Sequence, residues 1–187
     1  MERPTIKSIK RRLKPGQILL VGRGGLSGWA ITSVTGGKVS HAALIDRSKG
    51  GIWIVVEAVR QGVVAHRLEH YLEDPHYRVL QIRDINPAKY PFALTALRRA
   101  ACSAAWLRVG KGYDFAQMLG FLWPQQAQRF DSHNRLICSE LVTWAWLEAS
   151  EGLVDLAPDG VPHGLVSPQS LAETDDLIDV WSWEDGA

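Results

Sequence analysis

Short apolar runs, each bounded by polar or glycine residues, dominate the first half of the chain. Aliphatic and β-branched runs with such boundaries are typical of strands. The pattern predicts five strands in this half and a sixth near the end, over residues 17–21, 41–46, 52–59, 62–67, 77–83 and 177–183. The short connections between most of these runs favour antiparallel pairing.

Helical spacing of apolar residues is more frequent in the second half. It predicts a long helix over residues 91–109 and another over 137–149. Shorter helices are expected at 27–34, at 115–122 and after Ser167, which is followed by proline, a residue favoured at the first helical position. Because strands cluster early and helices later, we expect an α+β fold in which an antiparallel sheet packs against the 137–149 helix.

The composition is that of one globular domain. Of the 187 residues, 46% are hydrophobic and 22% are charged, and no glycine- or proline-rich linker or repeat divides the chain. We therefore expect a single domain over residues 1–187 with a basic arm at 1–14. A formal net charge of +1 indicates no polyanionic partner, so nucleic-acid binding is not expected.

The basic arm allows two interpretations. Ile6, Ile9 and Leu13 are spaced among lysines and arginines as in a weakly amphipathic helix suited to an anionic membrane. A solvated arm is the simpler interpretation and the one we favour. The apolar run at 18–21 is too short for a signal sequence, and no run reaches the roughly 18 apolar residues of a membrane span, so a cytoplasmic location is expected.

The two cysteines of the chain, Cys102 and Cys138, differ in their surroundings. Cys138 lies in the first turn of the predicted 137–149 helix, after a polar, turn-rich stretch. Free N–H groups and the helix dipole at this position favour the thiolate, which is the nucleophilic form. A buried structural cysteine is the alternative at this point. Cys102 lies within an alanine-rich helix, where a thiol is typical of packing.

A histidine and a glutamate on two predicted strands favour the interpretation of Cys138 as a nucleophile over that of a structural cysteine. Residues 47–51 form a loop suited to a hairpin, and a symmetric pairing centred on Lys49 places His41 directly opposite Glu57 on one face. Glu57 lies in an otherwise apolar run, and a buried carboxylate is costly unless it is paired. A carboxylate that orients an imidazole, and an imidazole that deprotonates a thiol, form a nucleophile–base–orienter arrangement.

Four segments, in chain order, resemble those of a known family: residues 40–44, 56–58, 113–115 and 138–142. Together they resemble the circularly permuted NlpC-type papain-like proteins of the YiiX-like group, which are distantly related to lecithin–retinol acyltransferase-like proteins. The resemblance implies a permuted papain-like fold with Cys138 as nucleophile, His41 as general base and Glu57 as the orienting residue. It also implies a place near the site for Tyr113, which we assign to substrate binding, and it requires no cofactor.

The expected function is that of a thiol hydrolase or acyl transferase that attacks an amide or ester carbonyl through Cys138. We favour a peptidase or amidase. One alternative is a lipid acyltransferase or phospholipase-like enzyme, and another is a non-catalytic ligand-binding module that keeps the fold. The expected partner is accordingly a peptide, amide or acyl-lipid substrate.

A competing metal motif follows the fourth predicted strand. His66, Glu69 and His70 match H-x-x-E-H, the inverted zinc-peptidase pattern, which needs a helix to bring both histidines to one face. The strand predicted at 62–67 runs into the motif, Pro75 leaves little room for a helix, and a third ligand is not obvious. We therefore expect no metal and place both histidines outside the site.

Overall fold

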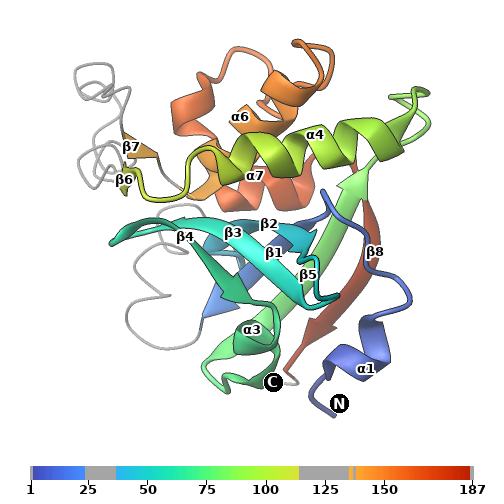
Figure 1. The fold of residues 1–187 in the computed structure, drawn as a ribbon, viewed down its shortest axis with the longest axis vertical. Helices are drawn as coiled ribbons and strands as arrows, with labels where there is room; N and C mark the ends of the chain where they lie inside the picture. Colours follow the sequence, from blue (N-terminus) through green and yellow to red (C-terminus); the bar gives the residue numbers. More distant parts are fainter. Residues whose placement is uncertain (1, 24–36, 114–134, 137, 186–187) are drawn as a thin grey trace.

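The computed structural model describes residues 2–23, 37–113, 135–136 and 138–185. Its main feature is a six-stranded sheet in which neighbouring strands are antiparallel, in the order β4-β3-β2-β1-β5-β8 (Figure 1). The strands are β1 (Ile18–Arg23), β2 (His41–Arg47), β3 (Trp53–Val59), β4 (Gly62–Arg67), β5 (Tyr77–Ile85) and β8 (Leu177–Glu184). A second, two-stranded ladder pairs β6 (Gly112–Tyr113) with β7 (Arg135–Leu136) in parallel.

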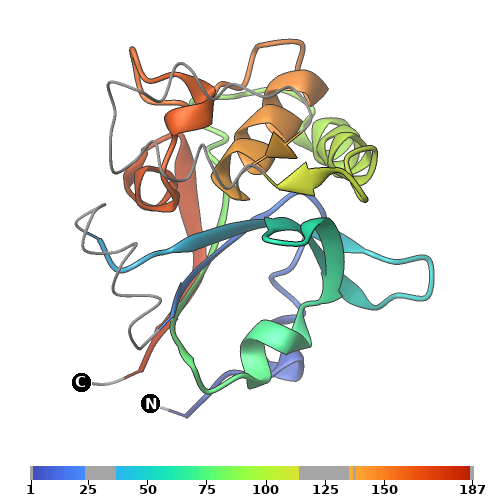
Figure 2. The ribbon, with the colours of Figure 1, turned by 90° about the vertical axis from the view of Figure 1, so that its left-hand side faces the viewer.

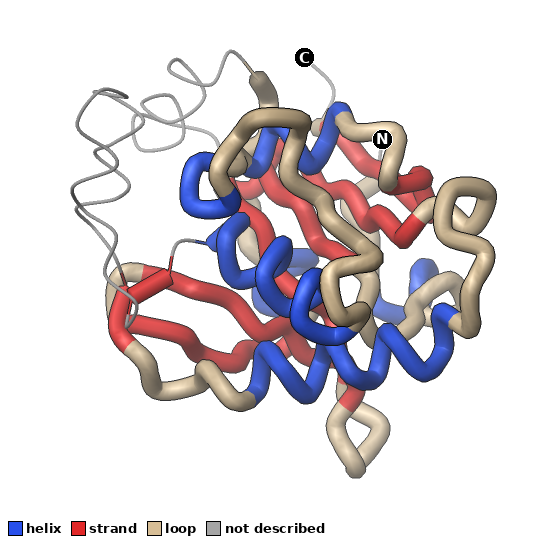
Figure 3. The backbone as a smooth tube through the Cα atoms, turned by 90° about the horizontal axis from the view of Figure 1, so that it is seen from above, coloured by secondary structure: helices blue, strands red, loops and turns tan. Residues whose placement is uncertain are grey.

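Helices cover both faces of the main sheet. On one face lie α4 (Leu94–Trp106), α6 (Cys138–Ala149) and α7 (Pro168–Glu173), and on the other lie α1 (Ile6–Ile9) and α3 (Glu69–Glu73) (Figures 1 and 2). A short 3-10 helix, η2 (His163–Leu165), precedes α7. Viewed from above, α4 and α6 lie side by side over the strands (Figure 3).

Each face of the sheet has its own apolar core, because successive strand residues point to opposite faces. The larger core packs strand residues such as Leu20 and Val56 against α4, α6 and α7, with Trp146 at its centre. The smaller core packs the alternate strand residues, such as Leu19, against α1 and against Tyr71 of α3. Burial on both faces explains why the central strands are nearly continuous apolar runs in the sequence.

The predicted α+β architecture is confirmed. Strands form at all six predicted places, and the helices expected over 91–109, over 137–149 and after Ser167 form as α4, α6 and α7. The Ser167 side chain accepts a hydrogen bond at 3.0 Å from a backbone N–H in the first turn of α7 and so caps this helix. The helical segments predicted at 27–34 and 115–122 lie outside the described residues.

The N-terminal arm is part of the fold, so the prediction of a solvated arm at 1–14 is wrong. Ile9 and Leu13 are buried in the smaller core, and Ile6 packs against it. The strands are apolar on both faces, and the second face needs a cover, which the spaced apolar residues of the arm supply. These side chains are therefore not free to enter a membrane. No helix among the described residues has the length and apolar character to cross a bilayer.

Arg3 ties the arm to the C-terminal end of α3. The last carbonyl groups of a helix lack partners within the helix. The guanidinium of Arg3 donates hydrogen bonds to four backbone carbonyls in and after α3, those of Leu72 (2.6 Å), Tyr77 (3.1 Å), Tyr71 (3.3 Å) and Asp74. It also lies over the ring of Trp183, 5.0 Å from its centroid.

Replacing Arg3 by alanine is expected to lower the free energy of unfolding by about 2 kcal/mol, because these carbonyl groups lose a charged donor. Urea denaturation followed by tryptophan fluorescence measures the change. Arg11→Ala, at an exposed position of the same arm, is the matched control, and we expect it to change stability by less than about 0.5 kcal/mol. Equal effects of the two substitutions would show that Arg3 contributes no more than a surface charge.

Candidate active site

Cys138 is the first residue of α6, the helix that packs across β2 and β3. Leu141, Val142 and Trp146 lie on the inner face of this helix and are fully buried in the larger core. This packing places the start of α6 at the beginning of β2, where the side chains of Cys138 and His41 lie close enough to shift each other's pKa. The helix thus holds a buried thiol against an imidazole from the sheet.

Glu57 on β3 holds the imidazole of His41. Oε2 of Glu57 lies 2.6 Å from Nε2 of His41. The Glu57 side chain is fully buried, whereas that of His41 is 20% exposed. Because the carboxylate occupies Nε2, Nδ1 is the ring nitrogen left for the Cys138 thiol. The contact predicted between His41 and Glu57 is present in the structure.

The strand register that makes this contact differs from the predicted one. Arg47 pairs with Trp53, so the hairpin is centred one residue later than expected. Gly51, with φ of 80°, allows the turn to form at this place. His41 and Glu57 are consequently diagonal neighbours instead of directly opposed residues. A shift of two residues leaves both side chains on the same face, and diagonal neighbours are within reach of long side chains.

Two further side chains hold the Glu57 carboxylate. Nδ1 of His66 on β4 lies 2.8 Å from Oε1, and the hydroxyl of Tyr71 on α3 donates to Oε2. The Tyr71 ring also stacks on that of His41, with the centroids 6.2 Å apart. Both carboxylate oxygens therefore have partners, which offsets the cost of burying the charge.

The prediction that His66 lies outside the site is wrong, and Tyr71 is a further residue of the site that no sequence pattern indicated. A two-residue loop joins β3 to β4, and its register sets His66 opposite Val55, on the face that carries Glu57. This short loop is the sequence signal that identifies His66 as a neighbour of the carboxylate. His70, the second histidine of the motif, follows on α3, with its ring centroid 5.5 Å from that of His66.

The charges of His41 and Glu57 stabilise each other. Burial alone would raise the pKa of Glu57, but a hydrogen bond to His41, the charge of His41 and hydrogen bonds from Tyr71 and His66 lower it to about 2. Burial alone would lower the pKa of His41. The charge of Cys138 and hydrogen bonds to Cys138 and Glu57 outweigh burial and raise this pKa. The imidazolium form is therefore favoured.

The Cys138 thiol is correspondingly easier to ionise. Burial opposes ionisation, but the charge of His41, a hydrogen bond to His41, and backbone hydrogen bonds from Ala42 and Ser139 lower the pKa of the thiol. A thiolate–imidazolium pair backed by a buried carboxylate is the arrangement of an activated nucleophile.

Cys102 lies in a different environment. It is a residue of the larger core, as its place in an alanine-rich helix predicts, and its Sγ lies 3.6 Å from the carbonyl oxygen of Ile45. Burial, together with the charge of Asp46, raises the pKa of this thiol. Both cysteines are thus buried, but the pKa of the Cys138 thiol is lowered and that of the Cys102 thiol is raised.

Tyr113, the remaining residue assigned to the site, ends β6. Its backbone pairs with Leu136 of β7, two residues before Cys138 in the chain. The two-stranded ladder therefore links this tyrosine to the segment that leads into the cysteine helix. The structure does not describe the Tyr113 side chain, and its role in substrate binding stays a prediction.

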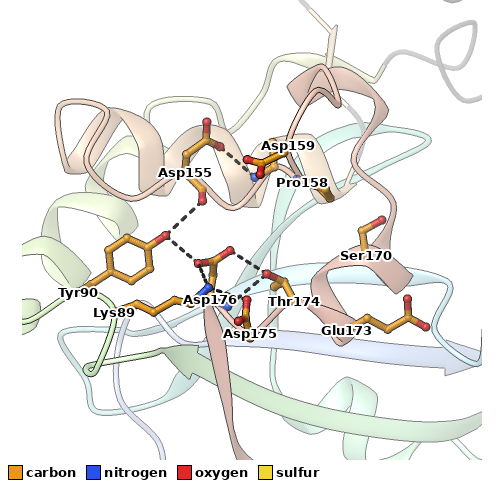
Figure 4. A pocket seen from close by; sticks show the side chains of 11 residues that line it. Lys89, Tyr90, Asp155, Pro158, Asp159, Ser170, Glu173, Thr174, Asp175 and Asp176 are labelled. Carbon is orange, nitrogen blue, oxygen red and sulfur yellow. Dashed lines mark hydrogen bonds and ion pairs between the residues drawn. The ribbon is translucent and has the colours of Figure 1, made fainter.

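A hollow of about 570 Å³ lies elsewhere on the molecule and shares no residue with the Cys138 site (Figure 4). Acidic side chains dominate its lining, and several of them already have partners within it. Lys89 binds Asp175 at 2.6 Å and Asp176 at 3.1 Å, and the hydroxyl of Tyr90 donates to Asp176 at 3.0 Å. We assign no ligand to this hollow.

No family model and no curated protein sequence matches this chain. A solved structure does resemble it: the crystal structure of the metalloprotein YiiX from Escherichia coli O157:H7, of the family of unknown function DUF1105. The two share a TM-score of 0.69 and 18% sequence identity over 92% of this chain and 99% of that one. At this identity the likeness establishes a shared fold alone, which agrees with the resemblance of the sequence to the YiiX-like group.

Proposed function

We propose that this protein is a thiol hydrolase or acyl transferase with a permuted papain-like, NlpC-type fold. The observation that carries the proposal is the chain of contacts at the start of α6. Nε2 of His41 lies 2.6 Å from the fully buried Glu57, and the same imidazole lies beside Cys138 and lowers the pKa of its thiol. The shared fold with YiiX supports the family assignment that the sequence motifs imply.

In the proposed reaction the Cys138 thiolate attacks the carbonyl carbon of an amide or ester. Backbone N–H groups at the start of α6 stabilise the oxyanion of the tetrahedral intermediate. His41 then donates its Nδ1 proton to the leaving amine or alkoxide, and a thioester remains on Sγ. Water or an acceptor attacks the thioester while His41 takes up the proton, and Glu57 holds the imidazole in place throughout.

Amides are the substrate class we favour over lipid esters. Lipid substrates would call for a contact with membranes, for which the apolar residues of the arm were one candidate; the other, residues 121–123, lies outside the described residues. Ile9 and Leu13 are instead buried in the smaller core. This burial weakens the lipid alternative and leaves a peptidase or amidase as the proposed activity.

The proposal includes no metal step. YiiX is described as a metalloprotein. In the ranges of this chain that the structure describes, no group of three or more His, Cys, Asp or Glu side chains is arranged to hold a metal ion. His66 is hydrogen-bonded to the Glu57 carboxylate instead. The side chains in these described ranges therefore do not fit a metal centre.

The test of the proposal is the relative reactivity of the two cysteines. Cys138 and Cys102 are both buried, at 8% and 4% exposure, so exposure alone does not predict a large difference between their rates. With iodoacetamide at about pH 6, we expect Cys138 to be alkylated at least about 100-fold faster than Cys102. Peptide mass mapping measures both rates. Equal labelling, or faster labelling of Cys102, would remove the basis for calling Cys138 the nucleophile.

A further inference from the structure

His66 connects the buried Glu57 carboxylate to solvent. Glu57 is fully buried, whereas the His66 side chain is 46% exposed, and Nδ1 of His66 lies 2.8 Å from Oε1 of Glu57. The other carboxylate oxygen, Oε2, accepts hydrogen bonds from His41 and Tyr71. His66 is thus the partner of the oxygen that His41 does not use.

The contact at Oε1 matters because a glutamate carboxylate rotates easily about its terminal bond. Hydrogen bonds at both oxygens fix the plane of the carboxylate, and with it the direction from which Oε2 meets Nε2 of His41. A hydrogen bond to the ionised carboxylate also favours the ionised form. Without the His66 donor, one oxygen of a buried charge would be left unpaired, at a cost larger than that of losing a neutral hydrogen bond.

We propose that His66 is a positioning residue, which fixes the Glu57 carboxylate so that it holds the His41 imidazole in the orientation that ionises the thiol. This inference rests on the proposed function and extends it to a fourth side chain. His66 acts through Glu57 and takes no direct part in the reaction. The titratable groups around it are Glu57 on β3, His70 and Tyr71 on α3 and, beyond the shared carboxylate, His41 on β2.

The test compares His66→Leu, which removes the donor, with His66→Gln, whose side-chain amide can still donate to Oε1. The rate of Cys138 alkylation by iodoacetamide is measured as a function of pH. We expect His66→Leu to move the profile to higher pH and to slow alkylation about 10-fold near pH 6. A less well fixed Glu57 stabilises the His41 imidazolium less, and the thiolate form of Cys138 is then less populated. His66→Gln should restore most of the rate. His70→Leu, at a neighbouring exposed histidine, is the matched control and should leave the profile unchanged.

Two results would overturn the inference. One is a wild-type profile in folded His66→Leu, and the other is a His66→Gln protein as slow as His66→Leu, since the donated hydrogen bond would then not be the cause. If His66→Leu does not fold, His66→Ala replaces it in the same comparison. Failure of the proposed function has a different signature, because wild-type Cys138 would then react no faster than Cys102.

Discussion

Replacing Cys138 by alanine is expected to abolish acylation of the protein and to reduce turnover by on the order of 10⁴-fold or more, because the proposed thioester forms on its Sγ. The measurement is intact-mass spectrometry after incubation with amide peptides and with short- and long-chain acyl esters. We expect the wild-type protein to gain an acyl mass with one substrate class, and amides are the class that we propose. Acylation by long-chain esters alone would favour the lipid acyltransferase or phospholipase-like alternative.

Two further variants make the result specific to the Cys138 thiol. Cys138→Ser should form an adduct slowly at best, because a hydroxyl beside the same imidazole is a poorer nucleophile than a thiolate. Cys102→Ala removes the other thiol and should retain acylation and turnover. A reactive wild-type Cys138 that gains no acyl mass from any substrate in the panel would favour the ligand-binding module.

The sheet could be predicted because each strand is a short apolar run with a polar or glycine boundary. The strand predicted at 62–67 forms as β4, so His66, the first residue of the H-x-x-E-H motif, lies on a strand and not on a metalloprotease helix. The α1 helix, Ile6–Ile9, lies where the spacing of apolar residues in the basic arm indicates a weakly amphipathic helix. Its apolar residues, Ile9 among them, had been assigned to solvent, since the sequence does not show that the second face of the sheet lacks cover.

The partnership of His41 with Glu57 could be predicted, although the register could not. A carboxylate in an apolar run needs a partner, and the imidazole of His41 lies one hairpin away. The alternation of side chains protects this prediction from an error of two residues, because such a shift keeps the face. An error of one residue would have separated the pair. The turn geometry set by Gly51 decides the register, and loop length alone does not reveal it.

The other partners of Glu57 required tertiary information. Tyr71 reaches the carboxylate from α3, a five-residue helix that follows β4 and is fastened at its end by Arg3 from the far N-terminus. Neither contact leaves a pattern in the sequence. His66 is an intermediate case, since the two-residue loop before β4 contains its register.

Replacing Glu57 by glutamine is expected to leave the fold standing while lowering turnover by on the order of 10² to 10⁴-fold. Glutamine has nearly the same shape. Its carbonyl can take the place of Oε2, and its amide can face His66, which can accept the amide proton in its other tautomer. The loss is therefore electrostatic: a neutral amide does not stabilise the imidazolium of His41 as a carboxylate does.

The sign of the pH effect follows from the same charges. In the wild-type protein the negative charge of Glu57 raises the pKa of His41, and the imidazolium in turn lowers the pKa of Cys138. Cys138 contributes most to the raised pKa of His41, and Glu57 adds to it; without the carboxylate the charged pair is less stable, so the iodoacetamide profile of Glu57→Gln should move to higher pH. Glu73→Gln, at an exposed position of α3, is the matched control and should leave rate and profile unchanged. A Glu57→Gln protein with the wild-type profile and rate would show that the buried carboxylate serves the fold and not the thiol.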